Sequence, residues 1–353
     1  MRKAAFALAV LATTFMVTLY VATTRAAEVT VVTVGFMETW VATTGDNRNN
    51  CSRTQPCRTF ERAIDMTAPG GHVGVLDAGN FGSFFIGKAL SITNDGPGEA
   101  RVTIRRPDVA INVRAGPSDR VYLRGLTIDG LEGGVIGIYF GAGAALHIHN
   151  CTIRNFRQRT TTPGAVGIMI AATAESEVYI SDSVITGNGN APEISYGLAI
   201  QPGEDGTAKV MLNRVQINDN VNGVLVDGSA ITRRPEIIVG RPAEQVRPMS
   251  LYLAMRDSVI AGNTGFGLTA RSTSTATPLG LATTVVVDRT MLVSNGVGIA
   301  ADSTRATVRV VDSTITGNGT GLLSLNAGHL NYAKSNTFGD NRVNIQDFPL
   351  SGP

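Results

Sequence analysis

The chain has 353 residues, of which 43% are apolar but only 6% aromatic, and it contains 40 glycines. This composition suits a fold of many tight turns and small β-branched residues and argues against large helical cores. The 30 basic and 28 acidic residues nearly balance, and no basic run is interleaved with aromatic residues, so the sequence gives no indication of nucleic-acid binding.

Residues 1–27 are predicted to be a signal peptide. They have a basic start, an apolar run at residues 4–21 and a small-residue end, where cleavage is expected near Ala26 or Ala27. An uncleaved membrane anchor is the alternative, because the run is long for a signal and Arg25 lies close to the cut. Cleavage removes three of the 30 basic residues and leaves 27 against 28 acidic ones, a net charge of −1. No later segment approaches the length of a bilayer span, so we expect a secreted, periplasmic or cell-surface protein without a membrane segment.

Residues 28–58 are predicted to form an N-terminal leader with a disulfide. Cys51 and Cys57, in CSRTQPC, could close a short loop in an oxidising compartment. A metal site at these cysteines would need two further ligands nearby, and the sequence shows none. The third cysteine, Cys151, is expected to be a small buried residue rather than a nucleophile.

A short phrase recurs through the rest of the chain, from RGLTIDG and HNCTIRN to VDSTITGN and KSNTFGDN. Its eight copies align on one apolar anchor residue each: Ile128, Ile153, Ile185, Ile217, Ile260, Leu292, Ile315 and Phe338. The intervals between them are 25, 32, 32, 43, 32, 23 and 23 residues. A basic unit of 23 residues with insertions is typical of a solenoid.

Asparagine follows the anchor by three residues in six of the eight units. These asparagines are Asn188, Asn220, Asn263, Asn295, Asn318 and Asn341. In stacked coils, an aligned column of amides can bond from one coil to the next and satisfy turn backbone groups. The alternative is that Asn-Gly merely marks a turn, but the fixed offset favours a structural ladder.

Each unit predicts three short strands and no helix. One strand contains the anchor, one follows the asparagine as a G-apolar-x-apolar segment, and one precedes the anchor by about seven residues, as in VYL, LHI and VML. Stacking pairs each strand with its copy in the next coil, which gives an all-β fold of parallel sheets. In these features the sequence resembles the secreted right-handed parallel β-helix proteins of the pectate-lyase-like superfamily.

The resemblance implies a right-handed parallel β-helix with three short strands per coil and a capped N-terminal end. The segments TWVATTGD and CSRTQPC resemble the leader that such proteins place before the first coil. Thr59 to Thr67 would form a short helix over the open sheet edge, with Thr59 as its N-cap. The helix and coils are predicted to span residues 59–344, followed by a tail at residues 345–353.

Strand alternation predicts the direction of the side chains in LHIHN. Leu146 and Ile148 align with apolar residues in other units and point inward, so His147 and His149 point outward. The alignment predicts two outward columns, with neighbours about 4.8 Å apart. The first contains Tyr122, His147, Tyr179, Met211, Ala254, Val286, Arg309 and Tyr332. The second contains Arg124, His149, Ser181, Asn213, Arg256, Asp288, Val311 and Lys334.

The resemblance implies that these columns form the floor of a cleft, walled by the long insertions at residues 227–250 and 270–284. Tyrosine rings can stack on sugars, and arginine can hold uronate carboxylates with two hydrogen bonds. The predicted substrate-binding residues are Tyr122, Arg124, His147, His149, Tyr179 and Arg256. The alternative is an ordinary polar outer face of a sheet. A metal site at His147 and His149 is disfavoured, because no third ligand occupies the adjacent column positions.

Known catalytic patterns of this superfamily are absent from the sequence. We find no carboxylate pair at the spacing of a lyase calcium cluster, no NTD…DD…GHG…RIK pattern of polygalacturonases, and no paired aspartates of pectin esterases. Calcium is therefore unsupported, and no cofactor is predicted. If elimination occurs, the candidate catalytic residues are Arg124, His147 and His149, with Tyr122 or Tyr179 as the acid.

Three functions follow from the sequence. The first is a protein that binds an extended, acidic polysaccharide in a surface cleft. The second is a divergent polysaccharide lyase or glycoside hydrolase. The third is a non-catalytic structural or surface-interaction protein that uses loops such as residues 230–248, which are locally positive. The sequence leaves the oligomeric state open.

Overall fold

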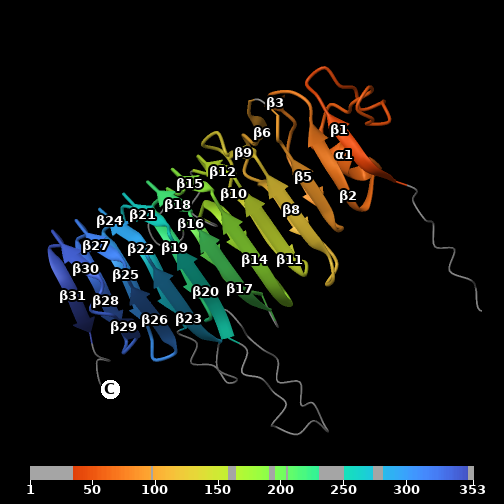
Figure 1. The fold of residues 1–353 in the computed structure, drawn as a ribbon. Helices are drawn as coiled ribbons and strands as arrows, with labels where there is room; N and C mark the ends of the chain where they lie inside the picture. Colours follow the sequence, from red (N-terminus) through yellow and green to blue (C-terminus); the bar gives the residue numbers. More distant parts are fainter. Residues whose placement is uncertain are drawn as a thin grey trace, which may run out of the picture. The chain divides into compact units, whose positions relative to one another are not determined.

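The structure is a computed structural model that describes residues 35–96, 98–157, 164–190, 195–203, 206–229, 250–272 and 281–348. These residues form one unit of stacked coils around a common core (Figure 1). The predicted signal peptide and the loop at residues 230–248 lie outside the described residues. No helix in the described part of the chain is long and apolar enough to cross a membrane.

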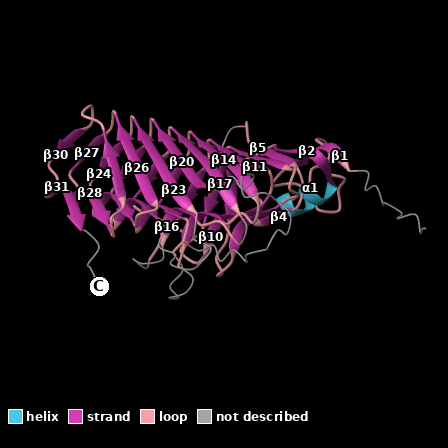
Figure 2. Cartoon of the chain, turned by 90° about the horizontal axis from the view of Figure 1, so that it is seen from below, coloured by secondary structure: helices cyan, strands magenta, loops and turns pink. Residues whose placement is uncertain are grey.

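Each complete coil contributes one strand to each of three parallel sheets. The first sheet contains β1 (Phe36–Val41), β2 (Thr67–Val75), β5 (Leu90–Thr93), β8 (Arg120–Arg124), β11 (Ala145–His149), β14 (Glu175–Ser181), β17 (Thr207–Asn213), β20 (Ser250–Arg256), β23 (Ala282–Asp288), β26 (Ala306–Val311) and β29 (His329–Tyr332). Figure 2 shows many of these strands side by side.

The second sheet contains β3 (Gly79–Asn80), β6 (Ala100–Thr103), β9 (Leu126–Asp129), β12 (Thr152–Arg154), β15 (Val184–Thr186), β18 (Gln216–Asn218), β21 (Val259–Ala261), β24 (Met291–Val293), β27 (Thr314–Thr316) and β30 (Thr337–Gly339). The third contains β4 (Phe84–Ile86), β7 (Val109–Arg114), β10 (Ile136–Ala142), β13 (Val166–Ile170), β16 (Tyr196–Ile200), β19 (Asn222–Asp227), β22 (Phe266–Arg271), β25 (Val297–Asp302), β28 (Thr320–Leu325) and β31 (Val343–Phe348). The predicted all-β, right-handed parallel β-helix is confirmed.

A short helix, α1 (Phe60–Met66), covers the N-terminal end of the core, as predicted. The Thr59 side chain accepts a hydrogen bond from the backbone N–H of Arg62, which caps the helix. The Phe60 ring packs against Phe81 and Phe84, with ring centroids 5.2 and 5.1 Å apart. The helix therefore closes the apolar end that a stack of strands would otherwise expose.

The inward side chains alternate along each strand as the repeat predicts. Leu146 and Ile148 are buried, and they pair in register with Val178 and Ile180 of the next coil. In the turn after the second sheet, the six asparagines at the fixed offset bond in sequence. Their side-chain amides are linked Asn188–Asn220–Asn263–Asn295–Asn318–Asn341 at 2.8–3.2 Å.

A second buried column lies just before the strands of the second sheet. Four residues in it donate a side-chain O–H to the carbonyl two residues earlier: Ser183, Ser258, Thr290 and Ser313. Cys151 occupies the same place, and its thiol donates to the His149 carbonyl at 3.4 Å. Burial raises the pKa of this thiol to about 11. Cys151 is thus a small hydrogen-bonded core residue. Because its buried thiol stays neutral, it is not a nucleophile.

The last coil departs from the predicted alignment. Asn331, not Tyr332, pairs with Arg309, and Tyr332 pairs with Val310. One additional residue in the turn between β29 and β30 causes this shift, so the predictions that Tyr332 and Lys334 end the outward columns were wrong. The last strand, β31, continues to Phe348, so the predicted boundary between coil and tail at residue 344 falls inside it.

Candidate functional site

Three aromatic rings form a continuous stack on the outward face of the first sheet. Tyr122 on β8, His147 on β11 and Tyr179 on β14 occupy one register position on adjacent strands. The ring centroids of Tyr122 and His147 are 4.4 Å apart, and those of His147 and Tyr179 are 4.8 Å apart. The ring planes differ by 12° and 10°. The spacing of the strands therefore sets the spacing of the rings.

The stack is open to solvent at its Tyr122 end. Ser91 on β5 precedes Tyr122 in the column, so no ring covers that face of Tyr122, whose residue surface is 42% exposed. At the other end, Tyr179 is half-buried and is followed by the exposed Met211 on β17. A ligand can reach a flat aromatic face at Tyr122, whereas His147 in the middle presents only its edge.

His147 is held as a neutral ring in this stack. Burial lowers its pKa from the ordinary value, the nearby charge of Arg120 lowers it further, and Glu177 partly opposes both effects. The His147 Nε2 atom is buried and has no hydrogen-bond partner in the described part of the chain. The Tyr179 hydroxyl donates to Glu177 at 3.1 Å, and this hydrogen bond raises the Tyr179 pKa. His147 is therefore unsuited to act as a cation near neutral pH.

His149 lies beside a fixed carboxylate. Its Nδ1 atom is 2.9 Å from the Ser181 hydroxyl and 3.3 Å from Asp182 Oδ2. Arg214 donates to both carboxylate oxygens of Asp182, at 2.6 and 2.8 Å. This hydrogen-bonded pair lowers the pKa of Asp182, so the group next to His149 stays ionised. A histidine oriented by a carboxylate can bind a hydroxyl or move a proton.

The two predicted arginines are placed differently. Arg124 follows Thr93 and precedes His149 in the second outward column, and its Nε lies 3.1 Å from Asp95 Oδ1. Arg256 lies three strands beyond His149 in the same column, about 14 Å along the sheet. It pairs there with Asp288 at 3.3 Å and with Asp257 at 3.6 Å. The structure thus brings five of the six predicted binding residues together and separates Arg256 from them.

Sequence reasoning missed a cavity of 340 Å³ at the N-terminal end of the same sheet face. It is lined by Trp40, Arg53, His72, Gly74, Val75, Leu76, Thr93, Asp95 and Gly96. The Asp95–Arg124 ion pair connects this cavity to the ring stack. The only tryptophan of the chain, in a leader that carries a disulfide, was the one available signal in the sequence.

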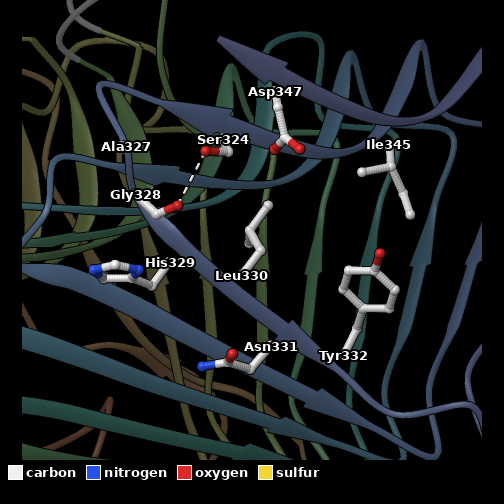
Figure 3. Close-up of a pocket in the computed structure, with 9 residues that line it drawn as sticks. All are labelled: Ser324, Ala327, Gly328, His329, Leu330, Asn331, Tyr332, Ile345 and Asp347. Carbon is white, nitrogen blue, oxygen red and sulfur yellow. Dashed lines mark hydrogen bonds between the residues drawn. The ribbon is translucent and has the colours of Figure 1, made fainter. Parts of the chain in front are cut away.

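A larger cavity of 600 Å³ lies at the opposite end, in the last coil (Figure 3). It is lined by Ser324, Ala327, Gly328, His329, Leu330, Asn331, Tyr332, Ile345 and Asp347. Leu330 and Ile345 occupy inward register positions that no following described coil covers, and the shifted Tyr332 joins them. This cavity is the open end of the apolar core, and it contains none of the predicted substrate-binding residues.

The predicted cleft walls are the long insertions after the strands of the third sheet. The long insertions at residues 230–249 and 273–280 lie outside the described residues. Within the described ranges, no three His, Cys, Asp or Glu side chains gather in a way that could hold a metal ion. Among the described residues, this face is thus a strip of rings, guanidinium groups and one carboxylate-paired histidine.

Solved structures that are similar to this chain include two lyases. One is the crystal structure of pectate lyase Pel9A, with a TM-score of 0.56 and 15% identity, covering 85% of this chain and 79% of that one. The other is an alginate lyase from Paenibacillus sp. str. FPU-7, with a TM-score of 0.53 and 9% identity, covering 86% and 99%. This likeness shows the pectate-lyase-like β-helix fold. No family model and no curated protein match the chain.

Proposed function

We propose that this protein binds an extended carbohydrate chain along the outward face of β5, β8, β11 and β14. The observation that carries the proposal is the stack of Tyr122, His147 and Tyr179. The stack ends at an exposed Tyr122 on β8, the strand that also carries Arg124, and the next strand, β11, carries His149. An aromatic face binds the apolar face of a sugar ring, and the flanking polar groups bind its hydroxyls and carboxylates.

The fold supports this class of ligand, and the disulfide supports an extracytoplasmic location of the protein. The two solved structures named above are a pectate lyase and an alginate lyase. The Cys51–Cys57 disulfide is formed, which fits an oxidising, extracytoplasmic compartment. Polysaccharide chains are extended, and so is the strip on which the predicted binding residues lie.

The first test is a binding measurement with acidic and neutral oligosaccharides by isothermal titration calorimetry. Tyr122→Ala should weaken binding about tenfold, because it removes the open stacking face. The matched control is Tyr139→Ala, which removes a tyrosine of the same coil from β10 on another sheet. Equal affinities for the wild type and Tyr122→Ala would place the ligand elsewhere, and no binding of any oligosaccharide would overturn the proposal.

A second candidate function is elimination within a uronate polymer, favoured by the 3.3 Å approach of His149 to Asp182. In this function the His149 imidazole accepts the proton from the carbon next to the carboxylate, and the carbon–oxygen bond of the leaving sugar breaks with its electron pair on oxygen. That oxygen takes a proton from water, and an unsaturated end forms. Mass spectrometry of incubated polymers should then show shortened chains with unsaturated ends, which His149→Ala abolishes. Unchanged polymers that still bind would leave binding as the function.

A further inference from the structure

The disulfide loop of the leader forms one side of the 340 Å³ cavity. The Cys51–Cys57 bond closes this loop, and the Trp40 backbone bonds to both ends of it. The Trp40 N–H donates to the Cys51 carbonyl at 2.7 Å, and the Cys57 N–H donates to the Trp40 carbonyl at 2.9 Å. Arg53, at the tip of the loop, is thus fixed close to the strand that carries Trp40.

The guanidinium group of Arg53 lies over the ring of Trp40. Its central carbon is 4.6 Å from the Trp40 ring centroid. The Trp40 ring also packs against Gly74, where a Cβ atom would overlap the ring. His72 contacts the edge of Trp40, with centroids 6.0 Å apart, and its Nε2 lies 2.6 Å from the Thr93 hydroxyl. Glycine at position 74 therefore lets the ring, and the guanidinium above it, adopt their positions.

Arg53 has no carboxylate partner among the described residues, although it is exposed and borders the cavity. Asp95, the carboxylate in the cavity lining, is paired with Arg124. A stacked guanidinium keeps its edge free for two parallel hydrogen bonds to a carboxylate. The guanidinium of Arg53 could therefore bind the carboxylate of an external ligand.

The cavity is continuous with the proposed binding strip. His72, Ser91 and Tyr122 follow one another in register on β2, β5 and β8. Trp40, Gly74, Thr93 and Arg124 do the same in the neighbouring column. Two strand spacings, about 10 Å, separate His72 from Tyr122, so a ligand that touches both positions contains more than one sugar unit.

Resting on the proposed function, we infer that this cavity is a subsite for an acidic sugar, in which Arg53 binds the carboxylate. The same ligand continues past Asp95 and Arg124 to the open face of Tyr122. The chain therefore distinguishes uronate polymers from neutral ones at its N-terminal end. The disulfide loop contributes to ligand recognition as well as to stability.

The test uses defined oligouronates and the same oligomers with each carboxylate reduced to a hydroxymethyl group, titrated by calorimetry. The wild type should bind the acidic oligomer about tenfold more tightly than the reduced one. Arg53→Gln should remove this preference, and Arg53→Lys should restore only part of it, because lysine lacks the planar fork. The control is Arg48→Gln, an equal charge change at an exposed leader residue outside the cavity, which should keep the full preference.

The outcomes separate the two proposals. If Tyr122→Ala weakens binding but Arg53→Gln keeps the preference for acidic oligomers, the subsite is wrong and the proposed function stands. Equal affinity of the wild type for both oligomers also overturns the subsite. If no oligomer binds to the wild type, the proposed function fails, and the subsite fails with it.

Discussion

At the scale of single residues, the centre of the site is a histidine that the fold keeps uncharged. His147 lies between two tyrosine rings, and its Nε2 is buried without a partner in the described ranges. A charged imidazolium there would lose hydration and face the positive charge of Arg120. The residue thus extends the aromatic surface, and His149, next to Asp182, is better placed for proton transfer.

The titration of His147 follows from this arrangement. Because its pKa in the folded protein is lowered, the unfolded chain binds the proton more readily. Its contribution to stability is therefore present above the ordinary histidine pKa of 6.5 and is lost as the pH falls towards the folded pKa. We expect an NMR titration of the ring to give a midpoint below 6.5. Arg120→Gln should raise this midpoint, because a neighbouring cation is removed; a wild-type midpoint at or above 6.5 would contradict the stacked, desolvated ring.

At the scale of elements, the asparagine turn holds neighbouring coils together through buried hydrogen bonds. Asn263 accepts from the backbone N–H and side chain of Asn220 at 3.1 and 3.2 Å. It donates to the Ile217 carbonyl at 3.1 Å and to Asn295 at 2.8 Å. Each amide thus satisfies turn groups of the coil before it, which removes the cost of burying unpaired backbone.

Removing one central amide should destabilise the coil stack. In Asn263→Ala, the Asn220 N–H and the Ile217 carbonyl lose buried partners, at a cost of about 2–4 kcal/mol. Asn341→Ala should cost less, because that residue lies in the last coil and is only partly buried. Urea unfolding followed by circular dichroism measures both variants. Equal losses at the two positions would show that burial along the column does not set the energy of these bonds.

At the scale of the whole described unit, the two ends of the stack are unequal. The first coil is covered by α1, whose Phe60 is fully buried against two phenylalanines. The last coil leaves Tyr332 and Ile345 exposed around the 600 Å³ cavity. In a solenoid each coil is stabilised mainly by its neighbours, so a coil with one neighbour opens more easily.

Hydrogen exchange should report this asymmetry. We expect the amides of β29, β30 and β31 to exchange fastest among the strands, and those of central strands such as β16 and β19 to exchange slowest. The N-terminal strand β2 should remain protected, because α1 and β1 contact it. Mass spectrometry of pepsin fragments resolves these segments. Equal protection of β29 and β19 would mean that the open end is covered in solution.

The sequence by itself determined the repeating architecture. Alternating apolar residues, the fixed anchor-to-asparagine offset and the Thr59 helix start are local patterns, and each identifies one coil position wherever it occurs. These patterns were enough to predict the three-strand coil, the inward and outward faces of its strands, and the placement of Tyr122, His147 and Tyr179 side by side. They failed at the last coil, where one added turn residue moved Tyr332 from the outward to the inward column.

Only the tertiary structure decided which outward residues act together. Ring stacking depends on side-chain rotamers as well as register, and the pairing of His149 with Asp182 or of Arg124 with Asp95 crosses from strand to turn. The cavity of Arg53, Trp40 and His72 joins a loop, a first strand and a second strand that lie up to 32 residues apart in sequence. No periodic pattern encodes such a contact, because the leader does not repeat and its position is set by the disulfide and the edge strand on which it folds.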